Sequence, residues 1–484
     1  MLSKRLDENI KIVDAAFKDC GDIVKRRLNI RQDGSGAVFV CYIDDLASRE
    51  LIEDTVLRGL VVDIRLTPPD SWNGELERLL DGSVTTADIK YSDSIFDAMD
   101  EVLAGNAMLL VDGCDRAVII SAKGFPKRGV EKPENEVAVQ GPKEAFAESI
   151  RVNTVLVRRR IRSTNLKCRQ LKIGRKTQTD VAVMYMEDTV RFEILDELLR
   201  RLESIDINAV LDSGYIEQYI EDNRLSPFPQ IQLTERPDKV AAELIEGRVA
   251  VIVDNSPFVL LVPALLAGFY QASEDYYQRW EIMSFIRLVR YAAGFLAFAL
   301  PGLYIALTLY HPSMIAYDLA LKLAGARATV PIPTIAELIF MELAFEALRE
   351  AGIRLPSAIG STLGIVGGII IGQAAVDAGL VSPMVVIVVA LTGICSFAVP
   401  NISLTSAYRL VKYGIILLSA ALGMYGWFLG IILLFTHLCS LESFGIPYLY
   451  PFTSASGVKD MGDSLVRVPL RKMRGSIFRR ENGR

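Results

Sequence analysis

One uncharged segment constrains the fold of this chain more than any other feature. The stretch YAAGFLAFALPGLYIALTLY, at 291–310, runs for 20 residues without Asp, Glu, Lys or Arg. A helix of this length spans about 30 Å, which matches the hydrocarbon core of a lipid bilayer. We therefore predict a membrane-spanning helix at this position.

Three further apolar segments predict additional spans, at 357–376, 384–399 and 413–438. Up to about residue 250, by contrast, charged residues occur every few positions. The composition suits a mixed architecture, because 51% hydrophobic residues are too many for an ordinary soluble protein and 23% charged residues are too many for a chain embedded throughout. We predict a cytoplasmic α/β N-terminal region followed by an α-helical transmembrane domain of about four spans.

The second predicted span carries glycine at every fourth position. Gly360, Gly364, Gly368 and Gly372 fall on one side of a helix, where they let another helix backbone approach closely. The nucleotide-binding spacings GxGxxG and GxxxxGK[ST] do not occur in this stretch. We predict a helix-packing seam; the alternative is that these glycines only reflect the general frequency of glycine in membrane helices.

The opposite face of the same predicted helix carries a different set of side chains. At about 100° per residue, it groups Thr362, Val366, Gln373 and Asp377. This order suits a pore in an oligomer, with Val366 as a hydrophobic constriction and Asp377 drawing cations at the cytoplasmic mouth. The alternative is that these side chains contact other helices of a complex.

The stretch PTIAELIFMELAFEALREAGIRLP lies between the first two predicted spans and is helical in pattern but charged. Each charge costs about 2.5–3.5 kcal/mol at the centre of a membrane, so this helix should not face lipid. Glu342 and Glu346 share a face, and Glu346 lies within one turn of Arg349. Two interpretations remain open: a solvated or interfacial face, or a ring of carboxylates that lines a cation path.

The charged N-terminal region contains an internal repeat. AVFVCYIDD resembles VAVMYMED, and DAMDEVLAGNAMLLVDGCDRAVII resembles KVAAELIEGRVAVIVDNSPFVLLV. The spacing repeats too, with 63 residues between Tyr42 and Gly105 and 62 between Tyr185 and Gly247. Each copy predicts a strand, an amphipathic helix, a second helix and a hairpin, hence two related α/β subdomains.

These patterns divide the chain into four parts. We expect α/β subdomains at 1–145 and 146–265, a transmembrane helical domain at 266–440 and a basic cytoplasmic tail at 441–484. The basic run RRRIR, at 158–162, is expected on the solvated side of a connecting helix, with contact to anionic lipid headgroups as the alternative.

Basic residues predict the orientation in the membrane, because cytoplasmic loops are enriched in Lys and Arg. Three arginines precede the first span and a basic tail follows Ser464: Arg279, Arg287 and Arg290, then Arg467, Arg471, Lys472, Arg474, Arg479, Arg480 and Arg484. Both termini are therefore expected in the cytoplasm, which requires an even number of spans and favours four. Arg409 and Lys412 would then lie outside, against the same rule.

Residues for catalysis or metal binding are sparse. The two histidines, His311 and His437, lie at the ends of predicted spans, and GxSxG, HExxH and HRD motifs are absent. The six cysteines form no CxxC pair, and a net charge of −5 lacks the excess of positive charge that is typical of nucleic-acid-binding proteins. We expect no enzyme activity, no catalytic residues, no metal, no cofactor and no nucleic-acid partner.

Several long motifs occur in a characteristic order. They are GPKEAF, EDNRLSPFPQIQLTERPDKVAAELIEGRVAVIVDNSPFVLLVPALL, ASEDYYQRW, LPGLYIAL, LREAGIRLP and GIVGGIIIGQAAV. From Gly141 to Pro469 the chain resembles the A subunit of spore germinant receptors, the GerA family, while the first 140 residues match only in general pattern.

The resemblance implies a multi-pass protein of the inner membrane of bacterial endospores, in contact with membrane lipid. It also implies two partners, a transporter-like B subunit that binds nutrient and a C lipoprotein subunit. The expected function is that of a homo-oligomeric, ion-conducting subunit that converts nutrient binding into ion release.

Two alternatives remain open. One is the accessory GerA-like protein associated with the dipicolinate channel operon, which the resemblance does not separate from a receptor subunit. The other is a stand-alone membrane transporter or enzyme, although transporters usually carry longer repeated sets of spans.

Overall fold

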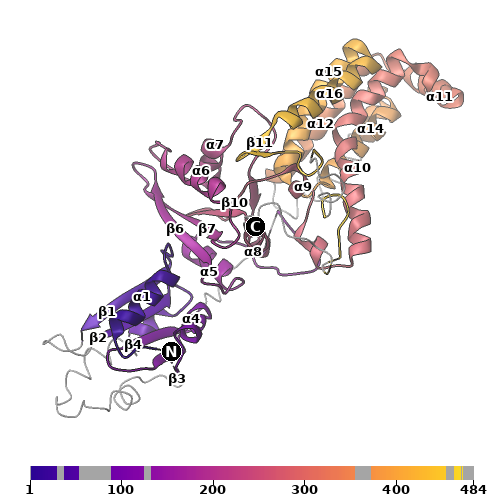
Figure 1. Cartoon of the computed structure of the whole chain (residues 1–484). Helices are drawn as coiled ribbons and strands as arrows, with labels where there is room; N and C mark the ends of the chain where they lie inside the picture. Colours follow the sequence, from indigo (N-terminus) through magenta and orange to yellow (C-terminus); the bar gives the residue numbers. More distant parts are fainter. Residues whose placement is uncertain are drawn as a thin grey trace. The chain divides into compact units, whose positions relative to one another are not determined.

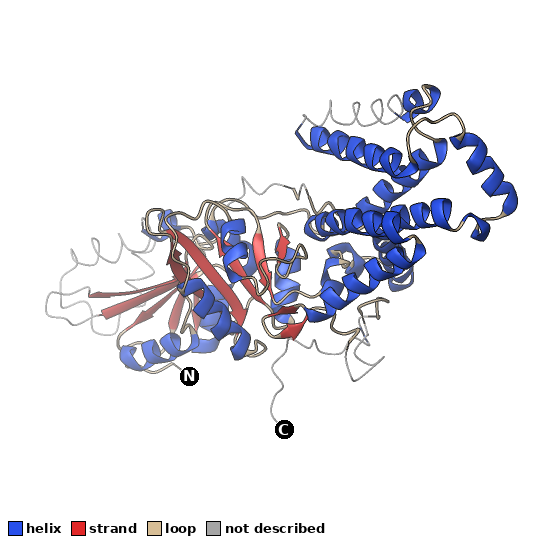
Figure 2. Ribbon diagram, turned by 90° about the horizontal axis from the view of Figure 1, so that it is seen from above, coloured by secondary structure: helices blue, strands red, loops and turns tan. Residues whose placement is uncertain are grey.

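The computed structural model describes residues 2–29, 37–53, 89–124, 132–133, 135–354, 372–453, 463–469 and 471. The described chain forms two compact units (Figure 1). The first unit takes in Met1–Glu221 and Ile231–Pro263, and the second takes in Asp222–Gln230 and Ala264–Arg474. Figure 2 shows that strands dominate the first unit and long helices the second.

The first unit contains two five-stranded antiparallel sheets with the same strand order. The first sheet has the order β1-β2-β4-β5-β3, with β1 Ile23–Asn29, β2 Ala37–Ile43, β3 Ile89–Ser92, β4 Ala107–Val111 and β5 Ala117–Ile120. The second has the order β6-β7-β9-β10-β8, with β6 Leu166–Ile173, β7 Thr179–Met186, β8 Gln232–Thr234, β9 Val249–Val253 and β10 Val259–Val262. This topology confirms the repeated arrangement of strands that the sequence predicts.

The register of the two sheets repeats as well. Cys41 pairs with Met108 in the first sheet, and Met184 pairs with Ala250 in the second. The turn before β4 has a positive φ of 95° at Gly105, and the turn before β9 has 99° at Gly247. Because this backbone conformation favours glycine, the repeated glycine of the sequence marks the same turn in both subdomains.

Equivalent helices cover one face of each sheet. They are α1 Leu6–Ala16 and α4 Ile95–Leu103 in the first subdomain, and α5 Ile150–Arg158 and α8 Pro237–Ile245 in the second. Val13 and Met99 pack into a core with Phe39, and Leu156 and Leu244 pack into a core with Met184. The remaining helices of this unit are α2 Arg49–Leu51, α6 Phe192–Glu203 and α7 Ser213–Ile220.

The basic run RRRIR lies only partly on a solvated face: Arg162 is exposed, but the prediction is wrong for Arg158. The side chain of Arg158 is only 1% exposed, and it joins the two subdomains through Asp22, with Nε–Oδ2 and Nη2–Oδ1 distances of 2.6 and 2.9 Å. Its Nη1 also donates to the Leu166 carbonyl at 2.9 Å. Burial by itself would lower the pKa of Arg158, but the Asp22 carboxylate holds it above its usual range.

Helices make up most of the second unit. The long ones are α10 Trp280–Ile305, continued by a π-helical turn η6 Ala306–Tyr310, then α12 Thr334–Arg354, α14 Pro383–Phe397, α15 Ile402–Leu422 and α16 Met424–Ser440. Shorter elements are α9 Leu266–Phe269, η5 Ser273–Tyr276, η7 Pro312–Met314, α11 Tyr317–Arg327, β11 Glu442–Ser443 and β12 Ile446–Pro447.

One helix of the described residues, Trp280–Tyr310, is long and apolar enough to cross a membrane. It contains the first predicted span, and α14 coincides with the third although it is shorter. The predicted span at 357–376 lies mostly outside the described residues. Four spans are therefore not confirmed.

The predicted single span at 413–438 is wrong, because the chain reverses within it. Gly423 adopts a φ of 61° and separates α15 from α16. The two helices then pack along each other, with Gly426 against the Leu418 backbone and Gly430 against Ile415. The close approach at these glycines makes an antiparallel helical hairpin.

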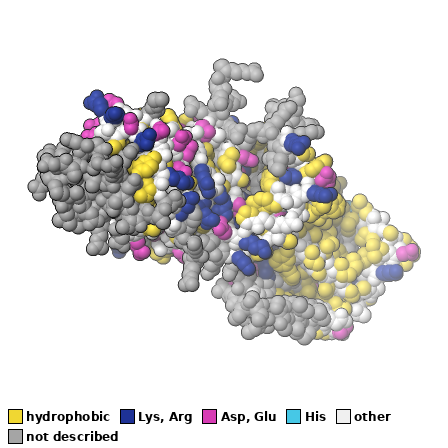
Figure 3. All heavy atoms as spheres, turned by 90° about the horizontal axis from the view of Figure 1, so that it is seen from below, with side chains coloured by type: hydrophobic (Ala, Val, Ile, Leu, Met, Phe, Trp, Pro, Cys, Tyr) yellow, Lys and Arg dark blue, Asp and Glu magenta, His cyan; other side chains and the backbone are white. Residues whose placement is uncertain are grey.

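The surface of the second unit is unusually apolar. Figure 3 shows exposed hydrophobic side chains gathered over its helices. They include Phe285, Ile387, Ile394, Phe397, Leu410, Leu417, Tyr425, Phe428, Ile432 and Leu433, each at least 50% exposed. A soluble monomer rarely exposes so large an apolar area, so this surface suits lipid or protein contact.

Candidate functional site

A buried charge network joins α12 to α15 inside the helical unit. The Lys412 ammonium lies 2.5 Å from the Glu342 carboxylate, and the two side chains are only 7% and 1% exposed. Glu342 therefore does not lie on a solvated face. A buried carboxylate is costly without a partner, and Lys412 supplies one from the neighbouring helix.

The network continues one turn along both helices. Glu346 pairs with Arg349 on its own helix, as the sequence spacing predicts, and with Arg409 of α15 at 2.6 Å. Glu342 and Glu346 are four residues apart and Arg409 and Lys412 three apart, so each pair shares one face of its helix. This pairing explains why Arg409 and Lys412 are tolerated within an apolar segment.

A small cavity of about 10 Å³ opens beside these ion pairs. Hydroxyl groups complete its lining: Thr392, Ser396, Thr405 and Tyr408. Its volume suits a single water molecule. Two carboxylates here face three cationic side chains, so the cluster is not an open acidic site, and the predicted carboxylate ring of Glu342 and Glu346 stays a prediction.

Glu337 is a second buried carboxylate on α12, one turn from the start of the helix. Its carboxylate accepts a hydrogen bond from the backbone N–H of Ser382, directly before α14. The side chain of Ser382 forms no cap of its own. A carboxylate from a neighbouring helix thus sits at the electropositive end of α14, where negative charge is stabilised.

Part of the predicted pore helix can be located. Gly360, Thr362, Gly364, Val366 and Gly368 lie outside the described residues. At its end, Gly372 is buried, whereas Gln373 and Asp377 are exposed, and the Gln373 amide donates to Asp377 at 3.0 Å. The roles of the glycine seam and of the pore-lining residues stay predictions.

The sequence did not reveal a second buried ionic cluster at the start of α10. Asp275, which is fully buried, accepts from Arg287 at 3.1 Å and from Arg290 at 2.7 Å. Arg287 also pairs with Asp463 of the C-terminal tail at 3.3 Å. Arg287 and Arg290 are therefore neutralised inside the protein, which weakens their use as indicators of membrane orientation.

Asp463 fixes part of the predicted basic tail against the helical unit. Its carboxylate accepts from the Tyr276 hydroxyl at 2.6 Å, and its backbone carbonyl accepts from Gln271 at 2.7 Å. Ser284 of α10 donates to the carbonyl of Arg467 at 3.2 Å. Asp463 is 187 residues from Tyr276 and 192 from Gln271 in the sequence, so sequence spacing does not predict these contacts.

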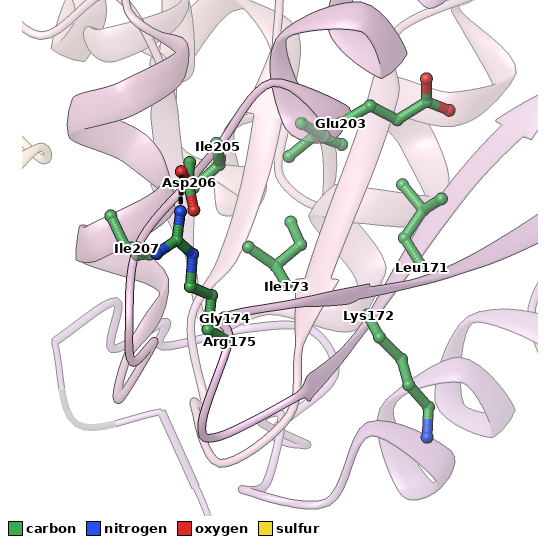
Figure 4. A pocket seen from close by; sticks show the side chains of 10 residues that line it. Leu171, Lys172, Ile173, Gly174, Arg175, Glu203, Ile205, Asp206 and Ile207 are labelled. Carbon is green, nitrogen blue, oxygen red and sulfur yellow. Dashed lines mark hydrogen bonds and ion pairs between the residues drawn. The ribbon is translucent and has the colours of Figure 1, made fainter.

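A shallow cavity of about 240 Å³ lies in the second subdomain, between β6 and the loop after α6 (Figure 4). Apolar side chains such as Ile173 and Ile205 line it, and Arg175 and Asp206 pair with each other at its rim. Lys172 points away from the cavity. The arrangement leaves no convergent set of polar groups to orient a ligand.

The described residues contain no group of three His, Cys, Asp or Glu side chains that could hold a metal ion. His437 does meet a serine, with its Nε2 2.9 Å from the Ser226 hydroxyl. No carboxylate of the described residues orients the other ring nitrogen, so this pair lacks the third member of a catalytic triad.

Comparison with known proteins covers nearly the whole chain. The family model described as Bacillus/Clostridium GerA spore germination protein matches residues 11–477, beginning well before Gly141, where the motif resemblance starts. The chain is 41% identical to spore germination protein KA of Bacillus subtilis, over 97% of this chain and 85% of that protein. It is 40% identical to the uncharacterized membrane protein YfkQ of Bacillus subtilis, over 100% of this chain and 93% of that protein.

A solved structure is also similar. It is the N-terminal domain of the A subunit of the Bacillus megaterium spore germinant receptor GerK3, which is 35% identical and matches 55% of this chain and 97% of that chain with a TM-score of 0.43.

Proposed function

Because the chain belongs to the GerA family of spore germination proteins, we propose that it is the A-type membrane subunit of a nutrient germinant receptor of bacterial endospores. The observation that carries the proposal is the match over residues 11–477, which includes both units of the structure. A match of this extent favours a shared role in germination over a shared domain alone.

The proposed location is the inner membrane of the spore, with several crossings and both termini in the cytoplasm. The apolar helix Trp280–Tyr310 and the exposed hydrophobic side chains of the helical unit support membrane insertion. The charged α/β unit suits an aqueous compartment.

The proposed partners are a transporter-like B subunit that binds the nutrient, a C lipoprotein subunit and further copies of this chain. The shallow cavity beside β6 has no convergent polar groups, so it gives no support for nutrient binding at that position. In this arrangement the chain receives the signal and transmits it.

The proposed outcome of the signal is ion release through an oligomer of this chain. Thr362, Val366, Gln373 and Asp377 would line the path, with Val366 as the constriction. Glu342 and Glu346 would contribute carboxylates to a cation path only after their ion pairs with Lys412 and Arg409 open. The closed network therefore suits a resting state.

A deletion experiment in the native spore former tests the proposal. Spores without this chain should fail to release K⁺ when the cognate nutrient is added, and the wild-type gene should restore the release. Germination induced without nutrient serves as the control and should stay normal. Normal K⁺ release from the deleted spores in response to every nutrient that triggers the parent strain would contradict the proposal.

A second candidate is an accessory GerA-like protein of the dipicolinate channel operon, because the family match does not separate such a protein from a receptor subunit. In that case deletion should leave nutrient-triggered K⁺ release intact and slow the later release of dipicolinate. The two candidates therefore differ in which release is impaired by the deletion: K⁺ release for a receptor subunit, and dipicolinate release for the accessory protein.

A further inference from the structure

A nine-residue segment, Asp222–Gln230, leaves the first unit and packs within the second. We call it the strap. It follows α7 and precedes β8, both of which belong to the first unit. The chain returns to the first unit at Ile231, so elements of that unit hold the strap at both ends.

The strap is anchored among the helices of the second unit by one aromatic side chain. Phe228 is 1% exposed, and its ring lies 6.1 Å from that of Tyr408 on α15 and 6.0 Å from that of His437 on α16. Tyr408 in turn packs on Phe298 of α10 at 5.1 Å. A single side chain of the strap therefore touches both arms of the α15–α16 hairpin.

Hydrogen bonds add to this anchor. The Ser226 hydroxyl lies 2.9 Å from Nε2 of His437, and Asp222 accepts from the backbone N–H of Phe444 at 2.8 Å. The Gln230 carbonyl accepts from the Ser443 hydroxyl at 2.8 Å. Both ends and the middle of the strap are thus bonded to α16 or to the turn that follows it.

The strap is also closed on itself. The side-chain oxygen of Gln230 accepts from the backbone N–H of Asn223, and its amide donates to the Asn223 carbonyl, each at 2.8 Å. Gln230 is buried whereas Asn223 is exposed, so these bonds are partly shielded from water. These two bonds tie the two ends of the strap to each other.

The contact of the strap with α15 lies next to the buried charge network. Tyr408 precedes Arg409, which pairs with Glu346 at 2.6 Å, and both residues line the small cavity beside Lys412. A shift of Phe228 would alter the packing of Tyr408 and, through it, the position of Arg409. Coupling over such a distance needs contiguous packed contacts, and the strap supplies them.

We infer that the strap is the coupling element by which the α/β unit controls the α15–α16 hairpin and the ion pairs that join it to α12. A displacement of α7 or β8 pulls the strap, moves Phe228 relative to Tyr408 and His437, and shifts the hairpin. This inference deepens the proposed signalling function by naming the segment that carries the signal.

The test measures hydrogen exchange of the full-length protein in detergent. Removing the N-cap of α7 by Asp212→Ala loosens the helix that leads into the strap, because Asp212 accepts from Gly214 at its first turn. In the wild-type background this change should speed amide exchange in α15 and α16 at least threefold. In a Phe228→Ala background it should leave their exchange unchanged, because the link is broken.

Leu225→Ala is the matched control, since Leu225 is in the same segment but 96% exposed. In this background Asp212→Ala should still speed amide exchange in α15 and α16. Should Phe228→Ala prevent folding, Ser226→Ala offers a milder change that removes the contacts of this hydroxyl to His437 and to the backbone N–H of Phe228. It should reduce the effect of Asp212→Ala on exchange in α15 and α16. The inference would be overturned if Asp212→Ala speeded exchange in α15 and α16 equally in the Phe228→Ala and Leu225→Ala backgrounds. It would also be overturned if Asp212→Ala did not change this exchange in the wild-type background.

A second arm uses spores and separates this inference from the proposed function. Phe228→Ala should slow nutrient-triggered K⁺ release at least tenfold at a normal protein level, and Leu225→Ala should not. If the wild-type gene itself gives no nutrient response, the proposed function fails while the exchange experiment still decides the coupling. If Phe228→Ala spores respond at the normal rate, the strap does not carry the signal.

Discussion

At the scale of single residues, the helical unit is organised by charges buried in pairs. Lys412 and Glu342 have almost no exposure, so each relies on the other for the interactions that water would otherwise provide. Arg287 and Asp275 form a second such pair, with side chains that are fully buried. Removing one member of a pair is therefore more harmful than removing both.

The pair of Glu342 and Lys412 gives the first prediction. Glu342→Gln or Lys412→Met should each lower the free energy of unfolding by about 3–5 kcal/mol, because an unpaired charge stays buried. The double variant should lose less than the sum of the two. Thermal unfolding of the four proteins in one detergent measures the coupling, and additive losses would show that the pair does not interact.

A carboxyl group in the α/β unit gives a prediction on pH. Burial, assisted by the carboxylates of Glu221 and Asp212, raises the pKa of Glu217 to about 7 from an ordinary value of 4.5. Between pH 4.5 and pH 7 the folded state therefore holds a proton on Glu217 that the unfolded state has released. The protonated Glu217 favours folding fully below pH 4.5, and this contribution to the free energy of unfolding is lost as the pH rises through 7.

Glu217→Gln should remove this dependence. Relative to the wild type, the variant should gain about 1–3 kcal/mol of stability on going from pH 5 to pH 8. The measurement is the difference in melting temperature between variant and wild type at each pH. A constant difference over this range would mean that Glu217 does not titrate there.

At the scale of elements, the hairpin of α15 and α16 depends on close backbone contact at glycine. A Cβ at position 426 would overlap the Leu418 carbonyl, whereas a Cβ at Gly414 on the same hairpin would meet nothing within 4 Å. The two positions therefore separate helix propensity from helix packing.

Gly426→Ala should destabilise the protein by about 1–3 kcal/mol, the usual cost of overpacking. Gly414→Ala should be neutral or stabilising by up to about 1 kcal/mol, because alanine favours a helix. Melting temperatures of the purified proteins test both. A tolerated alanine at 426 would show that the helices do not approach as closely as described.

The sequence predicts the elements whose signals are local. The repeated strands β2, β4, β7 and β9 and the turn glycines Gly105 and Gly247 follow from apolar runs and spacing. Strands β1 and β6 were missed because their sequences, IVKRRLN and LKCRQLKI, are charged and suit an edge position in the sheet.

The misses in the candidate site have a different cause. Nothing in the run around Gly423 interrupts its hydropathy, so a hairpin is indistinguishable from one long span. The partners of Glu342 and Arg287 are distant in sequence, and a lone sequence contains no record of such contacts. Arg158 was placed on a solvated face because its partner, Asp22, lies in the other subdomain.

At the scale of the whole molecule, the chain combines a duplicated α/β unit with a helical unit whose exposed side chains are largely apolar. The cavity beside β6 in the α/β unit has no convergent polar groups, and the helical unit holds charges in closed pairs. This division suits a protein that receives a signal in one part and opens a path in another.

The most direct test of this account is K⁺ efflux from spores that carry Val366→Ala. Shortening the side chain at the proposed constriction should widen it, so these spores should release K⁺ without nutrient. Ile371→Leu is the matched control in the same segment and should leave release dependent on nutrient. If Val366→Ala spores retain their K⁺ and release it only with nutrient, at the normal rate, the proposed gate and the ion path through this chain are contradicted.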